Sequence, residues 1–164
     1  MLNYARLREL LEYDPMTGIF KWRIYRAWQS MPGKVAGYAT KRGYVHISVD
    51  QKSYKAHRLA WLYVHGIWPD TAHLDHINGN PADNRIANLR LATPSQNGMN
   101  SRRYQNNTSG FKGVTKGKRD KMWRAQIKKA GVLIQLGRFE TPEQAHVAYC
   151  AAAVKLHRDY RRTE

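Results

Sequence analysis

The segment HLDHINGNPADNRIANLRLATPSQN, residues 73–97, holds two apolar runs separated by a polar loop. The loop, NGNPADNR, is rich in residues that favour tight turns. The runs on either side of it, AHLDHI and IANLRLAT, are short and strand-like. Thr93 followed by Pro94 predicts the start of a helix, because Thr can cap a helix and Pro is tolerated at its first position. The segment therefore predicts a hairpin followed by a helix, a ββα unit.

The chain has 164 residues and carries 28 Lys and Arg against 12 Asp and Glu, a formal net charge of +16. Such an excess repels itself in the folded state and indicates a polyanionic partner, with nucleic acid as the first candidate and an anionic membrane as the second. The charge is uneven, because residues 53–97 are nearly neutral while residues 1–52 and 98–164 are basic. A site that holds a cation would be spared in this way, since Lys and Arg there would repel the metal.

Other classes of protein are disfavoured by what the sequence lacks. No apolar segment approaches the length that spans a bilayer, and residues 1–14 lack the apolar region and cleavage site of a secretory signal. Cys150 is the single cysteine, so neither an internal disulfide framework nor a cysteine-based zinc site is expected. These features predict a cytoplasmic protein.

The N-terminal part predicts a mixture of strands and short helices. Asn3 can cap a helix that has Leu7, Leu10 and Leu11 on one face, and a turn at 14–18 ends it. Strand-like runs follow, namely IFKWR, KVAGYA and YVHISVD. Residues 55–65 suit a helix that stops at Gly66.

The C-terminal part predicts a sheet with one helix. Residues 98–110 have few apolar side chains and are interpreted as a linker or arm. Three strand candidates follow, FKGVTKG, MWRAQIKK and VLIQLGRF, and Thr141 with Gln144 predicts a capped helix whose apolar stripe can cover a sheet. Apolar residues alternate with Arg124, Gln126 and Lys128, which places these polar side chains on one face of the sheet, favouring contact with DNA.

The Asp75-His76 pair has the chemistry to hydrolyse a phosphodiester bond. A neutral imidazole can take the proton of an attacking water, and a divalent ion can stabilise the charge on phosphate and leaving oxygen. Neighbouring side chains on a strand point to opposite faces, so a shared site requires the strand to break at about 77–79. Asn88 can then tie the loop, and Asn97 can bring an amide oxygen from the following helix.

These residues resemble the HNH endonuclease motif, in the variant found in phage and intron-encoded homing endonucleases. The shared pattern is an Asp-His-x-Asn-Gly core, then Asp-Asn-Arg, Asn-Leu-Arg and Ser-x-Asn. The resemblance implies that His76 is the general base, that Asp75 binds the metal, and that Asn88 holds the loop and orients the base. Asn97 stands where the family often has His, and is implied as the second metal ligand. An amide oxygen is a hard ligand, so Mg²⁺ or Mn²⁺ is expected, with one ion per active site.

The segment from Ser109 to His157 is similar to the DNA-binding domain of plant ethylene-response factors, the AP-two fold. The shared pattern includes Trp-x-Ala-x-Ile, Leu-Gly-x-Phe and Ala-Tyr-x-x-Ala-Ala. The positions that match that family's DNA contacts are Lys112, Thr115, Gly117, Gln126, Lys128 and Gln135. With basic residues near the motifs added, the predicted DNA-binding set is Arg90, Arg102, Arg103, Lys112, Thr115, Lys116, Arg124, Gln126, Lys128 and Gln135.

The sequence thus predicts an α+β protein with a ββα-metal (HNH) nuclease core and a C-terminal three-stranded sheet with one packed helix. The predicted domains are an N-terminal β-rich region at 1–52, the nuclease core at 53–100, a linker at 101–110 and the AP-two-like domain at 111–164. The expected activity is site-specific cleavage of double-stranded DNA, typical of a homing endonuclease in a bacterial host cell, by a monomer or homodimer without a membrane partner. Alternatives are a DNA-binding regulator that does not cut, an RNA-binding protein, and a nuclease that has lost activity.

Several polar residues also have structural interpretations. We expect surface or half-buried positions for five histidines, namely His46, His57, His65, His146 and His157. Turn formation is expected for Asn78, Asn80, Asp83 and Asn84. Arg85 suits an ion pair with Asp83 or a phosphate contact equally well, and Arg90 suits a clamp on the scissile phosphate or a solvated strand position.

Overall fold

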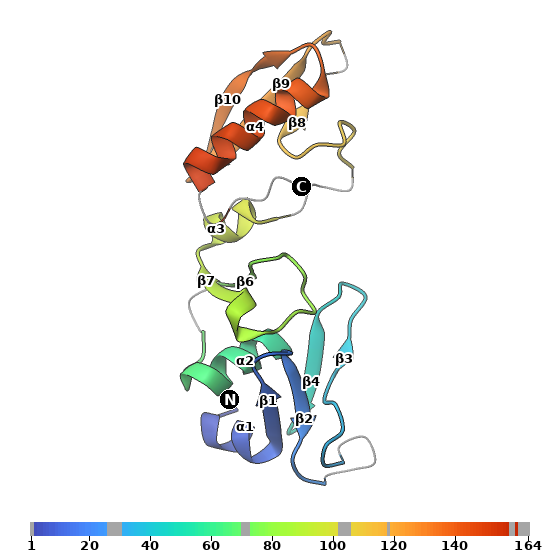
Figure 1. The fold of residues 1–164 in the computed structure, drawn as a ribbon, viewed down its shortest axis with the longest axis vertical. Coiled ribbons are helices and arrows are strands. Elements are labelled where there is room, and N and C mark those ends of the chain that lie inside the picture. The colour runs from blue at the N-terminus through green and yellow to red at the C-terminus, as the bar shows by residue number, and fades with distance from the viewer. Residues whose placement is uncertain are drawn as a thin grey trace. The chain divides into compact units, whose positions relative to one another are not determined.

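The computed structural model describes residues 2–25, 31–69, 73–101, 106–117, 119–157 and 160. The chain forms two compact units, residues 1–92 and 93–164 (Figure 1). Both units mix helices with strands, so the protein is of the α+β class. In the described part of the chain, no helix combines the length and the apolar character that crossing a membrane requires.

The first unit begins with helix α1, Tyr4–Leu10, capped as predicted by Asn3, whose side chain accepts a hydrogen bond from the amide of Arg6 at 2.8 Å. The placement of Leu11 on this helix is wrong, because Leu11–Asp14 forms strand β1. Buried and exposed residues alternate along β1, which pairs antiparallel with β2, Ile19–Trp22. The predicted turn joins the two strands, and the Asp14 carboxylate caps it by accepting hydrogen bonds from the Met16 amide and the Thr17 hydroxyl.

A three-stranded antiparallel sheet follows, in the order β3-β4-β5. Its strands are β3, Tyr38–Ala39, β4, Val45–Val49, and β5, Lys52–Lys55. Strand β3 takes up only two residues of the predicted run KVAGYA. Helix α2, Ala56–His65, ends as predicted at Gly66, whose φ of 74° is the left-handed conformation that closes a helix at low cost for glycine.

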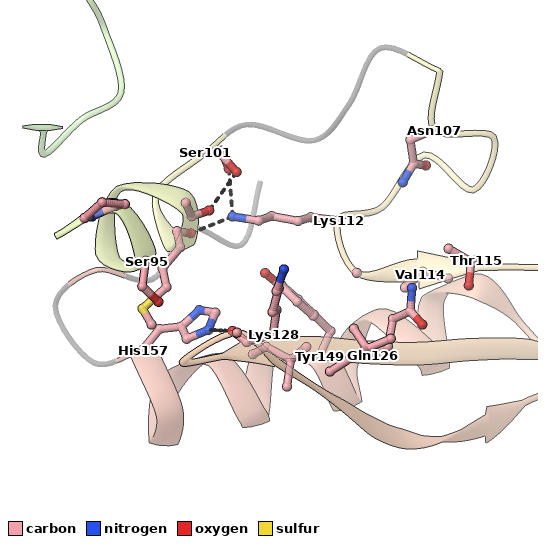
Figure 2. Close-up of a pocket in the computed structure, with 17 residues that line it drawn as sticks. Ser95, Ser101, Asn107, Lys112, Val114, Thr115, Gln126, Lys128, Tyr149 and His157 are labelled. Atoms are coloured by element: carbon pink, nitrogen blue, oxygen red, sulfur yellow. Dashed lines mark hydrogen bonds between the residues drawn. The ribbon is translucent and has the colours of Figure 1, made fainter. Parts of the chain in front are cut away.

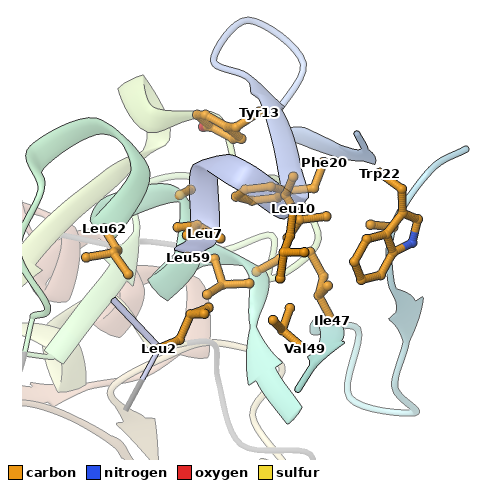
Figure 3. Packing of buried hydrophobic residues seen from close by; sticks show 14 of the residues in the cluster. Leu2, Leu7, Leu10, Tyr13, Phe20, Trp22, Ile47, Val49, Leu59 and Leu62 are labelled. Carbon is orange, nitrogen blue, oxygen red and sulfur yellow. The ribbon is translucent and has the colours of Figure 1, made fainter. Parts of the chain in front are cut away.

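One hydrophobic core joins these elements (Figure 3). Leu7 and Leu10 of α1, Ile47 of β4 and Leu59 of α2 are fully buried in it. Leu89, which opens strand β7, belongs to the same cluster. The hairpin that carries the Asp-His pair is therefore anchored in the core built by the N-terminal residues.

That hairpin consists of β6, His73–His76, and β7, Leu89–Ala92, paired antiparallel. A short 3-10 helix, η2 at Ile86–Asn88, precedes β7. The next helix, α3 at Pro94–Met99, has the predicted Thr93 cap, and the Gln96 side-chain oxygen in turn accepts a hydrogen bond from the Thr93 amide. The order strand, strand, helix is thus as predicted, and α3 is part of the second unit.

The second unit has a three-stranded antiparallel sheet in the order β10-β9-β8. Its strands are β8, Val114–Thr115, β9, Trp123–Lys129, and β10, Val132–Phe139. Helix α4, Pro142–His157, covers one face (Figure 1). Buried Ala125 and Ile127 of β9 pack in clusters with Ala145 and Tyr149 of α4. Arg124, Gln126 and Lys128, which alternate with these buried residues along β9, therefore face away from α4.

Candidate functional site

His76 ends strand β6 and is only 6% exposed. Its Nε2 lies 3.5 Å from the side-chain oxygen of Asn84, and its ring is neighboured by the rings of His57 and Tyr44. Burial lowers the pKa of His76, although the hydrogen bond with Asn84 and the charge of Asp75 act in the opposite direction. The imidazole is therefore neutral near pH 7, which is the form that can accept a proton.

His57 was expected at the surface or half-buried, and this prediction is wrong, because the residue is 5% exposed on the inner face of α2. Its ring meets that of His76 edge to face. Burial, and then the nearby His76, lower the pKa of His57 to about 3. Its spacing from Ala56 and Ala60, which share the buried face of α2, is the sequence signal that could have identified it.

Asn84 was predicted only as a turn residue, and the structure adds a contact with His76. The residue is 2% exposed, and its side-chain NH₂ donates to the Ala82 carbonyl oxygen at 3.0 Å. Its own carbonyl oxygen accepts a hydrogen bond from the Tyr13 hydroxyl at 2.7 Å. Tyr13, which is distant in the chain, thus holds the backbone of the residue whose side chain faces the imidazole, and no pattern in the sequence signals this.

The turn between β1 and β2 packs against the loop between β6 and β7, at Asn84 and Arg85. Gly18 has a φ of 74°, and a Cβ built on it would lie 2.4 Å from the backbone nitrogen of Arg85 and 2.6 Å from the carbonyl carbon of Asn84. Both the conformation and the lack of space require glycine here. The loop next to His76 therefore rests directly on the N-terminal hairpin.

Asn88 closes the loop that follows His76. Its side-chain oxygen accepts from the Asn78 amide at 3.0 Å, and its NH₂ donates to the Asn78 side-chain oxygen at 3.0 Å and to the Asp83 carbonyl oxygen at 2.9 Å. Its carbonyl oxygen accepts from the amide of Ile77 at 2.9 Å, directly after His76. This geometry ties both ends of the loop together.

Within the loop, the four predicted turn residues bond locally. Asn78 and Asn80 accept hydrogen bonds from amides two residues further along the chain. Of the two roles open for Arg85, the structure has the ion pair with Asp83, at 2.6 Å. The hydrogen bond from Arg85 lowers the pKa of Asp83 to about 2.

Asp75 lies beside His76 and is 5% exposed. Its cross-strand partner is Arg90 on β7, which donates from Nε at 2.9 Å and from Nη2 at 2.7 Å, both to Oδ2 of Asp75. Because the Arg90 side chain is only 15% exposed, its interpretation as a solvated strand residue is wrong. The expected strand break is present, since β6 ends at His76 and a turn follows.

The two predicted ligands, Asp75 and Asn97, both offer oxygen atoms, which hard cations such as Mg²⁺ prefer. No group of three or more His, Cys, Asp or Glu side chains among the described residues could hold a metal. The carboxylate of Asp75 fits an ion such as Mg²⁺, which keeps several waters and needs few protein ligands. Asn97 lies on α3 in the second unit, and its role as a ligand stays a prediction.

In the second unit, three of the predicted DNA-binding cations contact the chain itself. Lys112 donates from Nζ to the carbonyl oxygens of Met99 and Ser101, each at 2.7 Å (Figure 2). Arg124 forms an ion pair with Asp120, and the Lys116 ammonium lies 5.0 Å from the centre of the Trp123 ring. These contacts fix the positions of the three charges.

The face of the sheet away from α4 carries the polar members of the predicted set. Gln126 and Gln135 are direct cross-strand partners, and Thr115 pairs with Arg124. Thr115, Lys128 and Gln135 are not buried by the sheet. Arg102 and Arg103 lie outside the described residues.

A cavity of about 590 Å³ lies in the second unit, with Gln126, Lys128, Tyr149 and His157 in its lining (Figure 2). The expected surface or half-buried position of His157 is wrong, because it is 5% exposed and its Nε2 lies 3.0 Å from the Lys128 carbonyl oxygen. No residue of the β6–β7 hairpin lines this cavity.

Comparison with known proteins supports part of this picture. Residues 54–99 match the family model described as HNH endonuclease. Protein 3.8 of Escherichia phage T7 is 38% identical over 80 residues, which are 49% of this chain and 66% of that protein. The uncharacterized HNH endonuclease L560 of Acanthamoeba polyphaga mimivirus is 33% identical over 128 residues, which are 77% of this chain and 65% of that protein. The chain thus spans slightly less than two thirds of each relative, and no solved structure matches it.

Proposed function

We propose that this chain, whose residues 54–99 match the HNH endonuclease family, is a metal-dependent endonuclease that hydrolyses a phosphodiester bond of double-stranded DNA. The observation that carries the proposal is the position of His76, a buried, neutral imidazole at the end of β6 that faces Asn84 and follows Asp75 in the chain. A group of this kind can accept the proton of an attacking water at neutral pH.

In this proposal His76 is the general base, and the surrounding residues hold its ring in place. Asn84 faces Nε2, His57 borders the ring, and Asn88 ties the loop after it. Asp75 and Asn97 are the proposed ligands of one Mg²⁺ or Mn²⁺ ion, with Asn97 proposed from the sequence resemblance alone. When bound, such an ion would supply positive charge for the phosphate and the leaving oxygen.

DNA affinity is assigned to the basic side chains and to the open face of the β8–β10 sheet. Arg90 and the ten-residue set that contains it remain proposed DNA contacts, including Arg102 and Arg103. The formal charge of +16 supports a polyanionic partner. The resemblance to the AP-two fold supports duplex DNA read by the sheet, and a homing endonuclease that acts in a bacterial cytoplasm is the specific role we propose.

A DNA-binding regulator without cleavage is the second candidate function, and the structure offers one observation in its favour. Asp75 is already bonded to Arg90, so its carboxylate is engaged within the chain. A regulator would share the basic charge and the C-terminal sheet, but it would not require His76 to be chemically competent.

The test is nicking of supercoiled plasmid DNA, including the host locus, with Mg²⁺, with EDTA, and with two histidine variants. His76→Ala removes the proposed base, whereas His73→Ala removes an exposed histidine from the same strand. We expect nicking with Mg²⁺ by the wild type and by His73→Ala, and its loss with EDTA or His76→Ala. Full-rate nicking by His76→Ala would reject the mechanism, and DNA binding without nicking under every condition would favour the regulator.

A further inference from the structure

Asp75 and Arg90 form a charged, nearly buried contact within the proposed site. Two N–H groups of one guanidinium point at the same carboxylate oxygen, Oδ2, at 2.9 and 2.7 Å. The side chains are 6% and 15% exposed, so water screens their attraction weakly. The residues are also direct partners in the β6–β7 register, which fixes their spacing.

We infer that Arg90 and the divalent ion compete for Asp75, so that the ion binds only when the guanidinium leaves Oδ2. This inference rests on the proposed function, in which Asp75 is a metal ligand. Oδ2 accepts two hydrogen bonds and has few lone pairs left for a metal, and the positive guanidinium repels a second cation from either oxygen of this carboxylate. Arg90 is thus a positioning residue that holds Asp75 in the ion-free protein.

The displaced guanidinium then lies beside the site with its planar N–H groups available. Such groups bind phosphate through two parallel hydrogen bonds, and a DNA phosphate is the anion that reaches a nuclease site together with the ion. Ion and DNA would then favour each other's binding through Arg90, and this coupling must be reciprocal. The charge of Asp75 would then be neutralised by Arg90 until the metal ion and the DNA are both present.

The ion side is tested by measuring Mn²⁺ binding to the full chain without DNA, from the EPR signal of the free ion. We expect Arg90→Gln to bind Mn²⁺ about tenfold more tightly than the wild type, the factor that corresponds to one charge-assisted hydrogen bond. The matched control is Arg85→Gln, which removes the same charge from an ion pair with Asp83 in which the guanidinium is about half exposed. A general electrostatic effect would change both variants equally, whereas competition at Asp75 changes only the first.

Two further variants separate this inference from the proposed function. Asp75→Asn should abolish tight Mn²⁺ binding, and unchanged binding in this variant would reject Asp75 as a ligand and with it the proposed site. If Asp75→Asn loses the ion but Arg90→Gln binds it no better than the wild type, the competition is rejected and the proposed site stands. Arg90→Lys keeps a positive charge at this position, and its Mn²⁺ affinity should lie between those of the wild type and Arg90→Gln. Thermal unfolding of each variant shows whether the fold is intact.

The DNA side is tested with a duplex and Ca²⁺ in place of Mg²⁺, by fluorescence anisotropy. The wild type should gain more DNA affinity on addition of Ca²⁺ than Arg90→Gln does, while Arg85→Gln should gain as much as the wild type. An equal gain in all three proteins would overturn the transfer of Arg90 to phosphate.

Discussion

The imidazole rings of His57 and His76 meet edge to face, with centroids 4.9 Å apart and planes at 86°. Both residues are at least nine-tenths buried, so neither ring can turn without displacing its neighbour. His57 lies on α2 and His76 on β6, and their contact therefore joins the helix of the N-terminal core to the strand that carries the proposed general base.

Replacing His57 should slow cleavage without weakening DNA binding. His57→Ala would leave space beside His76 and let its ring turn away from the attacking water, so we expect the single-turnover rate to fall by a factor of roughly 10 to 100. His57→Phe retains an aromatic edge and should lose less. Nicking at the wild-type rate by the alanine variant, with the fold intact by circular dichroism, would show that the contact has no such role.

The same residue should make stability depend on pH. The unfolded chain protonates His57 below about pH 6.5, whereas burial holds its pKa in the folded protein at about 3. His57 therefore leaves the free energy of unfolding unchanged above pH 6.5. Between pH 6.5 and pH 3 only the unfolded chain binds this proton, so the free energy of unfolding falls by at most about 1.4 kcal/mol per pH unit. Urea unfolding of the wild type and of His57→Phe between pH 7 and pH 4 should give curves that diverge as the pH falls; parallel curves would contradict the assignment.

Tyr13→Phe should weaken the loop beside the site. The Tyr13 hydroxyl donates to the Asn84 carbonyl oxygen, and burial raises the pKa of Tyr13 to about 12, so the proton stays available. Leaving that carbonyl oxygen unpaired should cost about 1–2 kcal/mol of unfolding free energy, measured by chemical denaturation. Tyr25→Phe, at a position 66% exposed, is the control and should change stability by less than about 0.5 kcal/mol.

Two lysines of the second unit should respond differently to removal. Lys128 is exposed on the sheet, and Lys128→Ala should reduce the salt dependence of DNA binding by roughly 0.9 in log–log slope. Lys112 donates to the carbonyl oxygens of Met99, the last residue of helix α3, and of Ser101, so Lys112→Ala should instead lower the melting temperature. Titrations at several salt concentrations distinguish the two, and the reverse pattern would place the phosphate contact at Lys112.

Local sequence signals predicted much of the secondary structure. The caps at Asn3, Thr93 and Thr141 depend only on neighbouring residues, and each is present. The helix stop at Gly66 and the turn at 14–18 are equally local. Leu11 was placed on a helix because leucines at 7, 10 and 11 suit a helical face, but pairing with Trp22 in β2 prevails.

The partners of the site residues were less predictable. Asn88 and the loop it closes follow from turn chemistry, whereas the burial of His57 and the contact of Asn84 with Tyr13 depend on segments that meet only in the folded chain. Arg90 had two open interpretations. It faces Asp75 because of the register of β6 and β7, which the sequence alone does not determine.

Gly18 bears on how this protein could be engineered. The segment matched to the nuclease family starts at residue 54, but the loop within it lies against a turn more than sixty residues upstream. Transplanting residues 54–99 alone onto another DNA-binding domain would remove the β1–β2 turn on which the loop packs. A transplant should instead run from residue 2 to residue 99, so that it keeps both the N-terminal hairpin and the proposed ligand Asn97.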